Sequence, residues 1–117
     1  MKIRDIVRVL DAEIVVDAGN LDLDVSCACG SDLMSDVMAY VKENVVLLTG
    51  LVNPQVVRTA EMMDIKVVVF VRGKNLPKTV TDLAEEKGIT IITTKYPMFI
   101  ACGKLYSAGL TGRGVWD

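Results

Sequence analysis

The sequence contains no histidine and only three cysteines among its 117 residues. Without histidine, one subunit has no Ser-His or Cys-His nucleophile pair, no histidine metal ligand and no histidine general base. The P-loop pattern G-x-x-x-x-G-K-[ST] is absent, and no G-x-G-x-x-G pattern leads from a strand into a helix. We therefore predict a protein that is not an enzyme and that carries no metal and no cofactor.

The sequence also lacks a strong excess of either charge, and it lacks long apolar runs. The chain has 13 basic and 15 acidic residues, a net charge of -2, and no basic block. This balance excludes the electrostatic footprint of a nucleic-acid-binding protein. Its apolar runs fall far short of the roughly 18 residues that a membrane span needs, and no secretory signal is visible. We expect a cytoplasmic protein with no nucleic-acid or membrane partner.

The clearest pattern in the sequence is a set of three apolar blocks, at residues 45–48, 67–71 and 89–92. They begin 22 residues apart, and the stretches between them have the periodicity of amphipathic helices. Consecutive apolar positions are typical of strands that are buried on both faces, as in parallel βαβ units. The pattern predicts an α/β fold with three layers, α/β/α, around a mainly parallel sheet of four to five strands.

The first thirty residues predict a short helix over 3–10, a strand over 13–16 and an alternating strand over 21–29. With the turn at 17–20 between them, the two strands would form a short N-terminal β-hairpin. Later helices are predicted from their caps: Ser31, Asn53 before Pro54, and Thr79 at their starts, and Gly88 at the end of the third.

Pro97 is expected to open a last helix that runs to about Tyr106. We therefore predict one domain over residues 1–106, followed by a glycine-rich flexible tail over 107–117. Trp116 lies in this tail, where it would either anchor in a partner's groove or stay unbound.

Four predicted loops follow the carboxyl ends of the parallel strands, where open α/β sheets gather their binding sites. These loops offer glycines for close backbone approach, hydroxyl groups and cations, which together suit a small anionic ligand. The alternative is that they are the caps and turns that any α/β domain needs. The candidate ligand-binding residues are Gly30, Ser31, Asp32, Thr49, Gly50, Asn53, Arg72, Gly73, Thr93, Thr94 and Lys95.

Two of the cysteines, Cys27 and Cys29, are two positions apart in a predicted strand, so both thiols point to one side. Such a pair, joined by Cys102, would suit a soft metal or thiol redox chemistry. The other interpretation is that these cysteines are small core residues that continue the apolar alternation of the strand.

Several segments resemble stand-alone DRTGG-domain proteins: residues 30–39, the helix that opens at Asn53, and residues 83–95. The resemblance covers about residues 1–106, and related domains include the N-terminal domain of HPr kinase/phosphorylase. It implies a regulatory or dimerising module in place of a catalytic one. It also implies a homodimer and a partner enzyme, such as an iron hydrogenase.

Together these features predict a non-catalytic regulatory or protein-interaction module that senses a small anionic metabolite or nucleotide. The alternative function is a metal- or thiol-redox accessory protein that uses Cys27 and Cys29.

Overall fold

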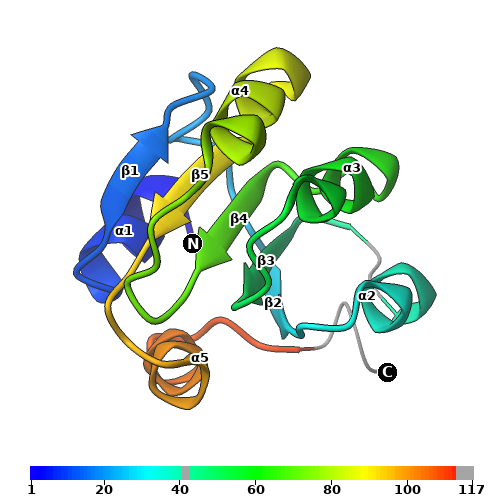
Figure 1. Ribbon diagram of the computed structural model, residues 1–117. Helices are drawn as coiled ribbons and strands as arrows, with labels where there is room; N and C mark the ends of the chain where they lie inside the picture. Colours follow the sequence, from blue (N-terminus) through cyan, green and yellow to red (C-terminus); the bar gives the residue numbers. More distant parts are fainter. Residues whose placement is uncertain (41–42, 113–117) are drawn as a thin grey trace.

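The computed structural model describes residues 1–40 and 43–112 (Figure 1). Five strands form one sheet in the order β1-β5-β4-β3-β2. Four neighbouring strands are parallel, and β1 joins the β5 edge in the antiparallel direction. The strands are β1 (Glu13–Val16), β2 (Cys27–Gly30), β3 (Val45–Thr49), β4 (Val67–Phe70) and β5 (Thr90–Thr93). The predicted α/β fold with a mainly parallel sheet is confirmed.

Helices cover both faces of the sheet (Figure 1). On one face α2, α3 and α4 pack against strand residues such as Leu47 and Phe70. On the other face α1 and α5 pack against residues such as Leu48 and Val69. Because neighbouring positions of β3 and β4 face opposite layers, every position must be apolar, which explains the unbroken apolar blocks. The helices are α1 (Ile3–Val9), α2 (Met34–Tyr40), α3 (Pro54–Met62), α4 (Lys78–Lys87) and α5 (Met98–Ser107).

The predicted N-terminal hairpin is wrong, because β1 and β2 lie at opposite edges of the sheet. The alternating segment before Cys27 does not pair with β1. Its backbone instead receives hydrogen bonds from the start of α1, with the Ile3 N–H donating to the Leu23 carbonyl at 3.1 Å. Leu21 and Val25 of this segment pack in the same apolar cluster as α1, whereas Leu23 is exposed. β2 is only four residues long.

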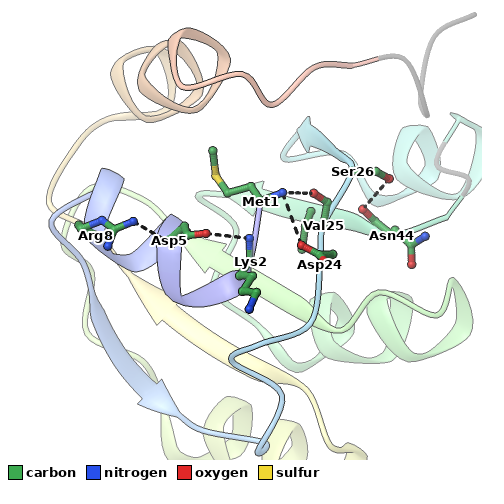
Figure 2. A network of polar contacts seen from close by, with 8 residues as sticks. All are labelled: Met1, Lys2, Asp5, Arg8, Asp24, Val25, Ser26 and Asn44. Atoms are coloured by element: carbon green, nitrogen blue, oxygen red, sulfur yellow. Dashed lines mark hydrogen bonds and ion pairs between the residues drawn. The ribbon is translucent and has the colours of Figure 1, made fainter.

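A polar network holds this N-terminal region together (Figure 2). The Met1 ammonium donates to the Val25 carbonyl at 3.2 Å, and the Asp5 carboxylate binds Arg8 at 2.8 Å. Ser26 donates to the Asn44 carbonyl at 3.4 Å. Because Ser26 and Asn44 immediately precede β2 and β3, their contact lies at the amino ends of the strands. It is therefore at the opposite end of these strands from the loops in which we expected a ligand.

Three of the helix ends predicted from the sequence agree with the structure, and two differ. Asn53 caps α3 by accepting from the Gln55 N–H at 2.9 Å, Gly88 ends α4 with φ +69°, and α5 begins after Pro97. The predicted cap at Thr79 is wrong, because α4 already begins at Lys78. The cap at Ser31 is also wrong, since α2 begins at Met34.

Ordered contacts continue beyond the predicted domain end at 106. Ser107 is the last residue of α5, and Leu110 is buried among α1 and α5 side chains. Thr111 then forms a parallel bridge with Cys27. Residues 113–117, with Trp116, lie outside the described residues. Within the part of the chain that the structure describes, no helix has both the length and the apolar character for crossing a bilayer.

Candidate functional site

The parallel strands β2 to β5 end at one edge of the sheet, and we call the loops that follow them the strand-end rim. This rim consists of residues 31–33, 50–53, 71–77 and 94–97. Figure 1 shows the loops after β4 and β5 running along the lower edge of the sheet. All predicted ligand-binding residues lie in these loops or at the strand ends beside them. However, some of these residues are bonded to other protein groups, whereas others are open to a ligand.

Asp32 links two loops of the strand-end rim. Its Oδ1 atom accepts from the Gly50 N–H at 2.6 Å and from the Thr49 hydroxyl at 3.1 Å. Thr49 and Gly50 are buried, so these donors depend on the carboxylate for their hydrogen bonds. The Gly50 N–H and the Thr49 hydroxyl, which we predicted as donors to an anionic ligand, are thus already bonded to Asp32.

Arg72 presents an exposed guanidinium beside Gly50. A Cβ atom at position 50 would lie 3.0 Å from Arg72 Nη2, and 3.5 and 3.6 Å from the two carboxylate oxygens of Asp32. Only glycine fits between these groups without a shift. Among the described residues the Arg72 guanidinium forms no hydrogen bond or ion pair. Its donors are therefore available to a ligand.

Lys74 lies in one of the four loops predicted from the sequence, although it is not among the candidate ligand-binding residues. Its Nζ atom donates to the Gly50 carbonyl at 2.6 Å, and this hydrogen bond links the loop after β4 to the loop after β3. The only signal in the sequence is its position two residues after Arg72. Because a lysine side chain reaches far from its backbone, this contact is not readable from spacing.

Four of the predicted residues have local structural roles. Ser31 accepts from the Leu33 N–H at 3.1 Å, and Asn53 caps α3. Thr94 is buried, and its hydroxyl donates to the Leu10 carbonyl at 2.8 Å. Gly30 faces α5, where an added Cβ would lie 2.8 Å from Cys102 Sγ. These contacts are the caps and turns of the alternative interpretation.

Gly73, Thr93 and Lys95 line a separate small cavity of about 160 Å³. This cavity also includes Asp11, from the turn between α1 and β1, and Glu13, the first residue of β1. The structure therefore divides the candidate residues into two groups, one around Gly50 and Arg72 and the other around Lys95.

The three cysteines are divided between the two helix layers, although Cys29 and Cys102 lie close enough for their thiols to interact electrostatically. Cys27 and Cys29 pack with the α2–α4 layer, whereas Cys102 packs with the α1–α5 layer on the other face. Burial raises the pKa of the Cys29 thiol, with a smaller contribution from the neighbouring Cys102. Burial also raises the pKa of Cys102. Among the described residues no group of three or more His, Cys, Asp or Glu side chains is arranged to hold a metal ion.

The sheet order, the helix layers and the polar rim define a small three-layer α/β domain. The chain belongs to the DRTGG domain family, whose model matches residues 5–107. The resemblance noted in the sequence is confirmed. Comparison with curated proteins gave no match.

A solved structure with the same fold comes from the regulatory region of a Clostridium perfringens pyrophosphatase. It contains the CBS and DRTGG domains, complexed with the activator diadenosine tetraphosphate. The TM-score is 0.77 at 14% sequence identity, with 99% of this chain and 50% of that chain covered. This chain thus spans about half of the pyrophosphatase region. In that protein a DRTGG domain is part of a regulatory region.

Proposed function

We propose that this chain is a non-catalytic regulatory domain that binds a small anionic metabolite or nucleotide at the strand-end rim. The observation that carries this proposal is the Arg72 guanidinium beside the backbone of Gly50, because this guanidinium has no partner within residues 1–40 and 43–112. A guanidinium presents its donors in a planar fork that matches carboxylate and phosphate oxygens. An anion at this position would therefore gain charge-assisted hydrogen bonds without displacing a protein partner of Arg72.

The surrounding contacts keep the Gly50 loop in place for such a ligand. Asp32 and Lys74 hold its N–H and its carbonyl, each at 2.6 Å. Because these two backbone groups are already bonded, side-chain cations would provide most of the ligand contacts. The pyrophosphatase regulatory region supports a nucleotide as the first probe, since it was crystallised with diadenosine tetraphosphate.

The test is calorimetric titration of the intact chain with diadenosine tetraphosphate, AMP and inorganic phosphate. We expect saturable binding of at least one of these anions, and at least about tenfold weaker binding by Arg72→Ala, as for the loss of a charged hydrogen bond. Arg58→Ala is the matched control, because Arg58 is exposed on α3 away from the rim. Absence of binding by all three probes, or equal loss in the two variants, would contradict the proposal.

The homodimer and the partner enzyme, including a redox enzyme such as an iron hydrogenase, stay predictions. Sedimentation at micromolar concentration tests the first, and a monomer would contradict it. The thiol-redox alternative predicts bound metal or an oxidation-sensitive function. Replacing Cys27 and Cys29 with Ala tests it, since unchanged metal content and ligand binding would remove that alternative.

A further inference from the structure

The cavity beside Lys95 has walls from three segments that are far apart in the sequence. The first is the turn after α1 together with the start of β1, with Asp11 and Glu13. The second is the loop after β4, with Lys74, and the third is the residues after β5, with Lys95. The antiparallel pairing of Glu13 with Thr93 brings the first of these segments to the strand-end rim.

Thr94 fixes all of these segments relative to one another. Its hydroxyl donates to the Leu10 carbonyl at 2.8 Å, just before the acidic turn. Its carbonyl accepts from the Gly73 N–H at 2.9 Å, in the loop after β4. Because Thr94 is buried, these hydrogen bonds are protected from water, and the cavity is formed before any ligand arrives.

Charges of both signs line the cavity without neutralising one another. None of the ion pairs within residues 1–40 and 43–112 joins Asp11 or Glu13 to Lys74 or Lys95. The side chains of Asp11, Glu13 and Lys95 have no hydrogen-bond or ion-pair partner among those residues, and Lys74 donates to Gly50. Two carboxylates and the Lys95 ammonium group are therefore open to a ligand that carries both charges, and the Lys74 ammonium group keeps N–H donors beyond the one that it gives to Gly50.

We propose that this cavity binds a small zwitterion of amino-acid size, with its ammonium group toward Asp11 and Glu13 and its carboxylate toward Lys74 and Lys95. A simple anion would meet the two carboxylates, and a simple cation would meet the two lysines, so each would be opposed by one pair. The volume of about 160 Å³ equals roughly five water molecules, well below the ~300 Å³ at which pockets for drug-sized ligands begin. A whole nucleotide does not fit this volume, so we assign the cavity a ligand different from the nucleotide proposed for Arg72, although Lys74 borders both sites.

The test is an NMR titration of the intact chain with L-alanine, propionate and ethylammonium, following the backbone amides of Gly73, Asn75 and Lys95. Propionate lacks the ammonium group of alanine, and ethylammonium lacks its carboxylate. We expect saturable shifts with L-alanine and none with the other two. No saturable shift with L-alanine, or the same shift with propionate, would overturn the proposal.

Variants separate this site from the anion site. Glu13→Gln and Lys95→Gln each remove one charge and should weaken L-alanine binding at least about tenfold. Glu86→Gln on the exposed surface of α4 is the control and should bind like the unmodified chain. Arg72→Ala should also leave L-alanine binding unchanged. Loss of L-alanine binding by Arg72→Ala would show that the two groups of residues form one site and would overturn the assignment.

Discussion

Gly30, at the end of β2, lies directly against Cys102 of α5. A Cβ atom at position 30 would be 2.8 Å from Cys102 Sγ and 3.2 Å from Met98 Sδ. Real Cβ atoms essentially never come within 3.0 Å of another heavy atom, so any side chain here would force Cys102, its helix or the strand to shift. The absence of a side chain at Gly30 therefore allows α5 to pack closely on the sheet, although we predicted from the sequence that Gly30 binds a ligand.

Gly30→Ala should lower the free energy of unfolding by about 1–3 kcal/mol, as overpacking does elsewhere. Cys102→Ala in the same chain removes the nearest sulfur and should restore part of the loss. Gly103→Ala is the matched control on α5, because nothing lies within 4 Å of its added Cβ. It should be neutral or raise stability by up to about 1 kcal/mol. Urea unfolding measures all three, and equal stability of Gly30→Ala and the unmodified chain would contradict the packing argument.

Asp32→Ala should destabilise the fold by about 1–3 kcal/mol, because two buried donors lose their acceptor. These donors are the Gly50 N–H and the Thr49 hydroxyl. Asp32→Asn keeps a side-chain oxygen and should lose less. Asp36→Ala, on the exposed side of α2, provides the control. If chemical unfolding gives the same result for the two alanine variants, the Asp32 contacts contribute nothing to stability.

Thr94→Val keeps the shape of the side chain and removes its hydroxyl. The Leu10 carbonyl then loses its donor, and the Tyr96 N–H loses an acceptor at 3.3 Å. The expected cost is about 1–3 kcal/mol, measured by thermal or urea unfolding. Thr94→Ser should retain more of the stability than Thr94→Val. A Thr94→Ser variant as unstable as Thr94→Val would indicate that methyl packing, and not the hydroxyl, is what matters.

Cys29 should react slowly with iodoacetamide in the native protein, because its pKa is raised by burial and the thiolate is the reactive form. A raised pKa means that folding favours the protonated thiol. This contribution to stability is present below the pKa of the unfolded chain and is lost as the pH rises through the folded pKa. Mass spectrometry after alkylation over a pH series, with the urea-unfolded chain as reference, measures the effect. Native reactivity equal to that of the unfolded chain would contradict it.

The sheet was largely predictable because β3, β4 and β5 are buried on both faces. Burial on both faces favours apolar residues at all positions except the threonines at the strand ends, and this pattern is visible in the sequence. The N-terminal region was not predictable in the same way. Leu21 and Val25 pack in the cluster that contains α1 while Leu23 is exposed, and an alternating pattern does not reveal which partner it packs against.

Of the candidate site, only the residues whose place follows from the order and direction of the strands were predictable. The rule that ligands gather at the carboxyl ends of parallel strands brought Arg72 and Lys95 to one edge. Asp11 and Glu13 were missed because they reach that edge only through the antiparallel pairing of β1 with β5, nearly eighty positions along the chain. The use of Asp32 as an internal acceptor also depends on side-chain geometry that spacing does not encode.

Two strand pairings at the borders of the sheet join residues that are far apart in the sequence. β1 covers β5, while Thr111 pairs with Cys27 on the outer side of β2. Pairings between such distant positions form late and slowly, because a long loop must first be closed. During synthesis, the Ala28 N–H on the outer side of β2 thus stays without this partner until Thr111 has emerged. In the finished fold the contact with Thr111 occupies a backbone group to which another strand could otherwise add.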